Sequence, residues 1–91
     1  MLSISFTKDA LKFTQSLETK PARQVYERML SLTLDPKPAA ATALIGFKGF
    51  FRLRVGDFRV VYSLDQDEVK VVLIDSRSDD EVYRKLERLV A

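Results

Sequence analysis

The chain has 91 residues, with 15 Lys or Arg and 13 Asp or Glu, and it contains neither His nor Cys. The missing Cys exclude disulfides and zinc–thiolate sites, and the missing His remove the commonest general base and metal ligand. No apolar run approaches the ~20 residues that a membrane span needs. These features predict one soluble cytoplasmic domain over residues 1–91, without a signal peptide, a metal or a cofactor.

The first third of the chain predicts one strand followed by two antiparallel helices. Residues 2–6 alternate strictly between apolar and polar side chains, as in a half-buried strand. Thr7 is placed to cap a helix, and Pro21 fits the first turn of a second one, where its missing N–H leaves no hydrogen bond unmade. The side chains spaced to face inward are Ala10, Leu11, Phe13 and Leu17 in the first helix and Val25, Met29 and Leu32, flanked by Tyr26 and Leu30, in the second.

Residues 35–49 are harder to interpret. The string Asp-Pro-Lys-Pro at 35–38 ends the second helix, because each Pro disfavours helix in the residue before it. The Ala-rich stretch that follows is compatible with a further helical turn, whereas residues 44–47, Leu-Ile-Gly-Phe, are compatible with a short strand. Both interpretations remain open.

Residues 51–62 predict a hairpin of two strands joined by a two-residue turn at Gly56 and Asp57, a pair suited to tight turns. Successive side chains of a strand point to opposite faces of the sheet. One face of the hairpin is then apolar, with Phe51, Leu53, Val55, Phe58, Val60 and Tyr62. The other face carries Arg52, Arg54 and Arg59.

The arginine face is the strongest sign of function in the sequence. A two-residue turn sets Arg54 directly opposite Arg59, and like charges facing each other across two strands are destabilising. The stretch from Lys48 to Arg59 contains four basic residues and one acid, against 11 basic and 12 acidic residues in the rest of the chain. We therefore expect this surface, with Lys48 included, to bind a phosphate-bearing or polyanionic partner.

The last third of the chain predicts a strand and a helix. Residues 65–68 form a polar turn, and residues 69–74 form a β-branched strand that is nearly apolar on both faces. A four-residue turn sets Ile74 beside Arg59. Residues 78–81, Ser-Asp-Asp-Glu, match a capping box for a final helix. The apolar stripe of that helix consists of Val82, Leu86, Leu89 and Val90.

These elements give the order β-α-α-β-β-β-β-α, an α+β domain with a mainly antiparallel sheet. Two residues from the C-terminal part can join the hairpin arginines, namely Arg77 just past the last strand and Tyr83 in the first turns of the final helix. Guanidinium groups bind phosphate oxygens through planar forks. A Tyr can stack on a base or move a proton.

The element order, the string Phe-Arg-Leu-Arg-Val-Gly-Asp-Phe-Arg-Val-Val-Tyr at 51–62 and the string Glu-Val-Tyr-Arg at 81–84 resemble the RelE/ParE superfamily of bacterial and archaeal toxins. The resemblance covers essentially the whole chain. It implies the RelE-like fold, in which two N-terminal helices pack on one face of the sheet and a C-terminal helix follows. It also implies a cognate antitoxin protein as partner.

The RelE branch of this superfamily consists of ribosome-dependent mRNA endonucleases. The resemblance to that branch implies cleavage of mRNA in the ribosomal A site by attack of a 2′-OH on the adjacent phosphodiester, without a metal or a small-molecule cofactor. The positions that match the catalytic set are Arg52, Arg54, Arg59, Arg77 and Tyr83. The expected RNA contacts are Lys48, Arg52, Arg54 and Arg59.

Two features depart from the RelE pattern. Both alternate hairpin positions are Arg where Lys is the familiar residue, and Arg is a far poorer proton-transfer group. Proton abstraction then falls to Tyr83, to an acid such as Asp57 or to the ribosome. The second feature is Asp75, which can either oppose RNA or orient an arginine.

Other interpretations remain open. The hairpin arginines are also compatible with a solvated outer sheet face, a bulge at the turn would break their register, and Tyr83 fits the edge of a core. The alternative functions are a ParE-type toxin that inhibits gyrase, a catalytically inactive RelE-like interaction module and a general RNA-binding domain. The apolar residues that the predicted core leaves unused are candidates for an antitoxin groove: Phe47, Phe50 and Val72.

Overall fold

The computed structural model describes residues 1–76 and 79–90, the side chains of Asp79 and Val90 excepted. In chain order the elements are β1 (Ser3–Phe6), α1 (Lys8–Ser16), α2 (Thr19–Ser31), β2 (Ala41–Ala43), β3 (Phe50–Val55), β4 (Phe58–Leu64), β5 (Glu68–Asp75) and α3 (Asp79–Val90). This order confirms the predicted strand, two helices, run of strands and final helix. The expected Ser78 cap of α3 lies outside the described residues.

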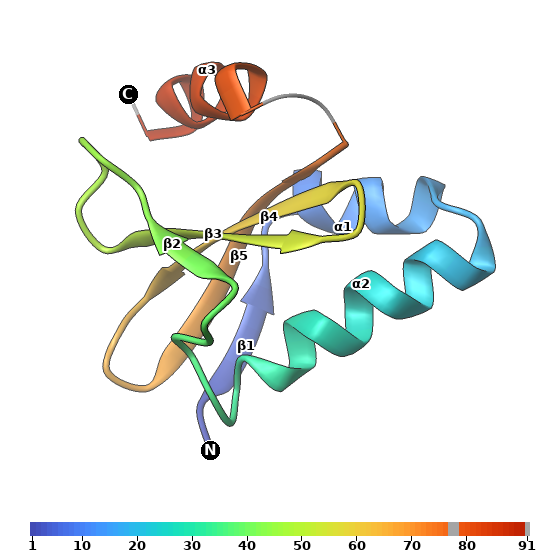
Figure 1. Cartoon of the computed structure of the whole chain (residues 1–91), viewed down its shortest axis with the longest axis horizontal. Helices are drawn as coiled ribbons and strands as arrows, with labels where there is room; N and C mark the ends of the chain where they lie inside the picture. The colour runs from blue at the N-terminus through green and yellow to red at the C-terminus, as the bar shows by residue number, and fades with distance from the viewer. Residues whose placement is uncertain (77–78, 91) are drawn as a thin grey trace.

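The five strands form one sheet in the order β1-β5-β4-β3-β2. β1 runs parallel to β5, whereas the β5–β4, β4–β3 and β3–β2 pairs are antiparallel. Figure 1 shows α1 and α2 together beside the sheet, with α3 separate from them above it. The predicted α+β class with a mainly antiparallel sheet is confirmed. Within residues 1–76 and 79–90, no helix is long and apolar enough to cross a membrane.

The main core lies between the sheet and the layer formed by α1 and α2. The hairpin residues predicted to face inward lie here, since Leu53, Val60 and Tyr62 are fully buried and Phe51 and Phe58 pack against this cluster. The buried side chains from the rest of the chain are Ala10, Val25, Met29, Leu32, Val69, Val71 and Ile74. The alternation along the hairpin and the helical spacing of the apolar residues therefore predicted most of this core, but Leu11, expected to face inward, is 46% exposed.

A smaller second core lies on the opposite face of the sheet, under α3. Its buried members are Leu44, Val61, Val72, Leu73, Val82 and Leu86, and Phe47, Phe50 and Tyr83 pack against them. The residues proposed for an antitoxin groove therefore pack with the α3 core, Val72 within it and Phe47 and Phe50 against it. Leu89, expected in the inward stripe of α3, is 44% exposed.

Local sequence signals identified the start of α1 but misplaced the strand after α2. Thr7 caps α1 as predicted, because its hydroxyl accepts a hydrogen bond of 3.2 Å from the N–H of Ala10. β2 occupies residues 41–43, earlier than the candidate strand at 44–47. Gly46 and Gly49 have φ of +84° and +85°, a left-handed conformation that interrupts a strand, so residues 44–49 turn the chain into β3.

A bulge between β4 and β5 changes the register that the sequence predicts. Leu64 pairs with Val69, as the prediction required, but Val72 is an extra residue of β5 with no residue opposite it on β4. Beyond this point Arg59 lies opposite Asp75, whereas the prediction placed Ile74 there, and that prediction is wrong by one residue.

Candidate functional site

The turn between β3 and β4 fixes which residues share a face of the hairpin. Gly56 has a φ of +59° and Asp57 has no positive φ, the pattern of a type II′ turn, whose twist matches that of paired strands. Arg54 pairs with Arg59, as predicted, and the pairing of β3 with β4 is continuous. The hairpin arginines therefore share the face of the sheet that α3 covers.

Arg54, Arg59 and Asp75 form a row across β3, β4 and β5 near the hairpin turn, which we call the charged row. Arg59 has a like charge opposite it on one strand and an opposite charge on the other, and each such pair contributes roughly 0.2–1 kcal/mol. Asp75 therefore offsets the repulsion between the two arginines. The like-charge pair does not by itself require an external anion, which corrects the inference drawn from the sequence.

Asp75 is 2% exposed and is the one buried charged residue in the part of the chain that the structure describes. Its Oδ2 accepts a hydrogen bond of 2.5 Å from Nζ of Lys85 on α3. A buried carboxylate is costly unless a cation and hydrogen bonds compensate for the lost water. Sequence reasoning missed Lys85, although its place three residues after Val82 lies on the inward stripe of α3.

Arg52 and Arg54 lie two residues apart on β3 but have different surroundings. Arg52 is half-buried and faces Val61 on β4. Arg54 is exposed beyond the end of β2, where β3 has no outer neighbour. There it borders a hollow of about 350 Å³, together with Gln24, Glu27, Arg28, Val55 and Gly56. Arg54 is therefore the hairpin arginine most accessible from outside.

Tyr83 lies in the α3 core and packs against the loop before β3. Its ring packs against that of Phe47, with the centroids 6.0 Å apart and the planes at 35°. Lys48, the next residue in that loop, is exposed. Val61 belongs to the same core and pairs with Arg52 across the strands, so Tyr83 packs with the direct neighbour of Arg52. Arg77 lies outside the described residues.

A hollow of about 360 Å³ lies between α1, β5 and α3. It is lined by Asp9, Phe13, Leu73, Ile74, Lys85, Arg88 and Leu89.

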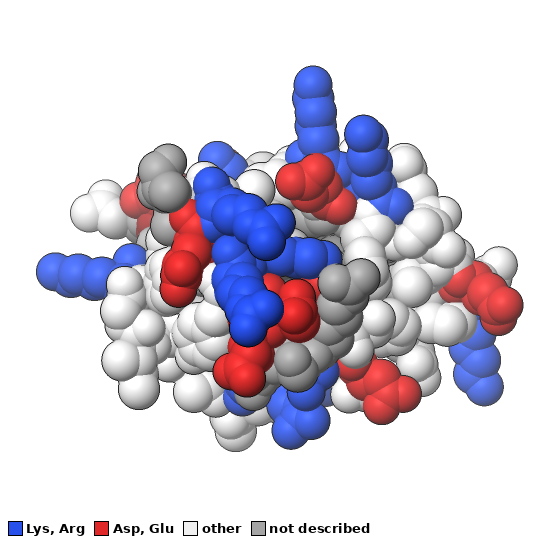
Figure 2. All heavy atoms as spheres, turned by 90° about the horizontal axis from the view of Figure 1, so that it is seen from above, with Lys and Arg blue, Asp and Glu red and all other residues white. Residues whose placement is uncertain are grey.

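Figure 2, seen from the α3 side, shows Lys and Arg side chains gathered near the middle of this face with Asp and Glu among them. This face is thus mixed in charge. Among the residues that the structure describes, no group of three side chains could hold a metal ion.

Solved structures with this fold come from archaea and bacteria. A chain of the archaeal RelE–RelB complex from Pyrococcus horikoshii is 26% identical, with a TM-score of 0.75 over 86% of this chain and 97% of that chain. A mutant of E. coli toxin RelE in the free state is 19% identical, with a TM-score of 0.81 over 99% of this chain and 98% of that chain. A chain of the intact E. coli RelBE toxin–antitoxin complex is 22% identical, with a TM-score of 0.72 over 86% and 99%.

Sequence comparison gives the family more directly. No curated protein sequence matches this chain. A family model described as the ParE toxin of type II toxin–antitoxin system, parDE, matches residues 4–81, from β1 to the first turn of α3. The chain therefore belongs to the ParE toxin family of type II toxin–antitoxin systems, within the RelE/ParE superfamily, and it has the fold of RelE toxins.

Proposed function

We propose that this toxin is an endoribonuclease that cleaves mRNA in the ribosomal A site. The observation that carries the proposal is the continuous pairing of β3 with β4, which puts Arg52, Arg54 and Arg59 on one face of the sheet. Guanidinium groups remain charged at any working pH and bind phosphate oxygens through two parallel hydrogen bonds. A surface of three arginines is therefore suited to the backbone of single-stranded RNA.

In the proposed reaction the 2′-OH of one nucleotide attacks the adjacent phosphodiester in line. The bond from phosphorus to the 5′-oxygen breaks, leaving a 2′,3′-cyclic phosphate and a 5′-OH, so one proton leaves the 2′-oxygen and one reaches the 5′-oxygen. The hairpin arginines bind phosphates and stabilise the charge of the transition state. Arg77 assists the leaving group or orients the scissile phosphate, and Tyr83 stacks on a base or carries the proton.

The proposed partners follow from the same assignment. The relative from Pyrococcus horikoshii was solved as a RelE–RelB complex. We expect this toxin likewise to bind a cognate antitoxin protein, and to act on the ribosome and mRNA in the cytoplasm. Lys48 is exposed in the loop before β3, and it extends the proposed RNA contacts toward that end of the hairpin.

Translation in vitro tests the activity and the residues together. Wild-type toxin is added to ribosomes translating a defined mRNA, and the new 5′-ends are mapped by sequencing. We expect Arg59→Ala and Tyr83→Phe to lower the cleavage rate at least about tenfold, because each removes a group assigned to the transition state. The control is Arg84→Ala, which removes a cation from the exposed side of the same helix as Tyr83. Cleavage by either variant at the wild-type rate would rule out the role given to that residue.

Inhibition of DNA gyrase is the second candidate function, because the matching family model carries the description of a ParE toxin. Inducing the toxin in cells separates the two candidates. Cleaved mRNA with no DNA-damage response supports the endoribonuclease, whereas a DNA-damage response with intact mRNA supports gyrase inhibition. A harmless protein that gives neither response is a catalytically inactive interaction module.

A further inference from the structure

We propose that Asp75 is a positioning residue that holds α3 against the charged row. It lies between two cations. It forms an ion pair with Lys85 of α3, and it lies opposite Arg59 of β4 in the sheet. The catalytic consequence of this role rests on the proposed function. The structural consequence, a fixed placement of α3, is measured without it.

The place of Asp75 depends on the bulge at Val72. With regular alternation from Val69 onward, residue 75 would point to the core under α1 and α2, because a slip of one residue exchanges the two faces of a strand. The extra residue instead turns the carboxylate of Asp75 to the α3 face. Bulges often aim a side chain at a functional site, and this one places an acid beside Arg59.

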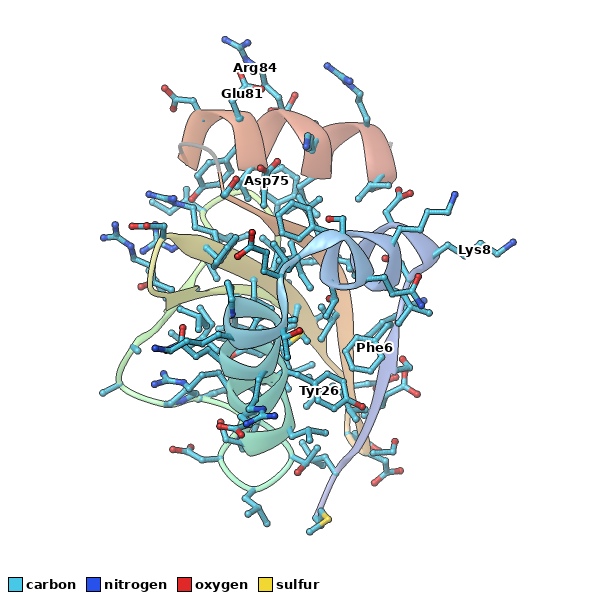
Figure 3. The ribbon with its side chains drawn as sticks, turned by 90° about the vertical axis from the view of Figure 1, so that its right-hand side faces the viewer. Phe6, Lys8, Tyr26, Asp75, Glu81 and Arg84 are labelled. Carbon is cyan, nitrogen blue, oxygen red and sulfur yellow. The ribbon has the colours of Figure 1, made fainter. Side chains whose placement is uncertain are left out.

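Two ion pairs among the described side chains of α3 and its neighbours differ in burial. The Asp75 side chain is 3% exposed and that of Lys85 is 36% exposed, with 2.5 Å between Oδ2 and Nζ. Glu81 and Arg84, by contrast, are 38% and 69% exposed and 3.5 Å apart. In Figure 3 Asp75 lies between the sheet and α3, whereas Glu81 and Arg84 point outward from the helix. The first pair joins α3 to the sheet, and the second lies within the helix.

α3 has few other attachments to the sheet. It lies mainly against β5, and among its described side chains only Val82 and Leu86 are buried. The hollow between α1 and α3 leaves part of the inner side of the helix without packing. This ion pair has a large influence on a helix held by so few contacts, because its carboxylate is buried and breaking a buried ion pair is strongly destabilising. Since α3 carries Tyr83, the same pair sets where Tyr83 lies relative to the arginines.

Hydrogen–deuterium exchange on the full chain tests the placement of α3. We expect Asp75→Asn and Lys85→Gln each to raise the rate of deuterium exchange in residues 80–90 by about tenfold, since local opening of α3 becomes easier. The double variant should show no more uptake than the larger single effect, because both changes break one interaction. Asp75→Glu, which keeps the charge, should retain most of the protection, and the control Arg84→Gln should match wild type. Equal uptake in Asp75→Asn and wild type, or equal increases in Asp75→Asn and Arg84→Gln, would overturn the proposal.

Cleavage kinetics separate positioning from general destabilisation. Asp75→Asn should lower kcat by about tenfold and change KM less than about twofold, because the pair orients α3 and does not bind RNA. A rise in KM with kcat unchanged would show that Asp75 contributes to RNA binding, and it would overturn the positioning role. If wild-type toxin cleaves no mRNA, the proposed function fails, and the exchange of α3 decides the role of Asp75 alone.

Discussion

The α1–α2 face and the α3 face of the sheet carry alternate residues of the same strands, yet they differ in how they are covered. The α1–α2 face is apolar throughout, and hairpin residues such as Leu53 are completely buried there. The α3 face is apolar where Leu86 packs, but near the hairpin turn it carries Arg54, Arg59 and the buried Asp75. Stability therefore depends mainly on the first face, while the second combines a small core with charged groups. Substitutions on the two faces should separate stability from activity.

Truncating one buried leucine on each face gives the largest expected effects. Leu53 and Leu86 are both fully buried, the first under α1 and α2 and the second on α3 itself. We expect Leu53→Ala to lower the free energy of unfolding by about 3–4 kcal/mol and Leu86→Ala by about 2 kcal/mol, because α3 can settle into the space that is left. Urea unfolding measures both values. Equal losses would show that the α3 core is packed as rigidly as the main core.

Tyr62 makes the stability of the α1–α2 face depend on pH. Its hydroxyl donates a hydrogen bond of 2.7 Å to the carbonyl oxygen of Pro36, and burial, with the negative charge of Asp35, raises the pKa of Tyr62 to about 12. Folding thus favours the neutral phenol over an ordinary pKa of about 10. This contribution is fully present below pH 10 and is lost as the pH rises through 12, and it amounts to about 2–3 kcal/mol.

Tyr62→Phe isolates that contribution. At pH 8 the variant should have a free energy of unfolding about 1 kcal/mol lower than wild type, because it lacks the hydrogen bond to Pro36. Between pH 10 and 12 its free energy of unfolding should depend less on pH than that of wild type. Urea unfolding of both proteins at several pH values gives the difference directly. Equal losses of stability in both proteins between pH 10 and 12 would rule out Tyr62 as the cause.

The sequence predicted the hairpin well because its turn and its alternation agree. The Gly-Asp turn fixes the pairing of Arg54 with Arg59, and the strict alternation assigns each side chain to a face. The register of β5 was not predictable in the same way. Residues 69–74 are nearly apolar on both faces, so a shift of one residue leaves no trace in the pattern. β2 was missed because Ala-Thr-Ala is a weak strand sequence, and only pairing with β3 makes it a strand.

The candidate site was predictable only where it depends on local pattern. The shared face of the hairpin arginines follows from alternation, and the structure confirms that placement. The link from Asp75 to Lys85 depends on the bulge and on where α3 docks, and neither is visible in a local stretch of sequence. The catalytic roles given to the arginines and to Tyr83 stay predictions.

Gly56 forms the turn that sets the pairing of β3 with β4, and so decides which side chains lie on each face. Replacing it tests how strongly the turn sets this register. Its φ of +59° lies in the left-handed region, and a Cβ there would meet no atom within 4 Å, so only the backbone conformation opposes a side chain. We expect Gly56→Ala to lower the free energy of unfolding by about 1–2 kcal/mol. Asp57→Ala, with no positive φ to maintain, should cost less than about 0.5 kcal/mol. Equal costs in urea unfolding would show that the turn does not depend on the glycine.

Arg54 gives the smallest expected effect on stability and the clearest separation between the two faces. Arg54→Gln removes a like charge opposite Arg59, so the free energy of unfolding should stay the same or rise by about 0.2–0.5 kcal/mol. If Arg54 binds a phosphate, the variant should bind single-stranded RNA more weakly. The plot of log binding constant against log salt concentration should also become less steep, by about 0.7 in the magnitude of its slope. Lys70→Gln is the matched control, because Lys70 is an exposed strand cation opposite Ser63. An equal loss of affinity in both variants would mean that RNA responds to net charge alone, whereas a loss confined to Arg54→Gln would place a phosphate contact at Arg54.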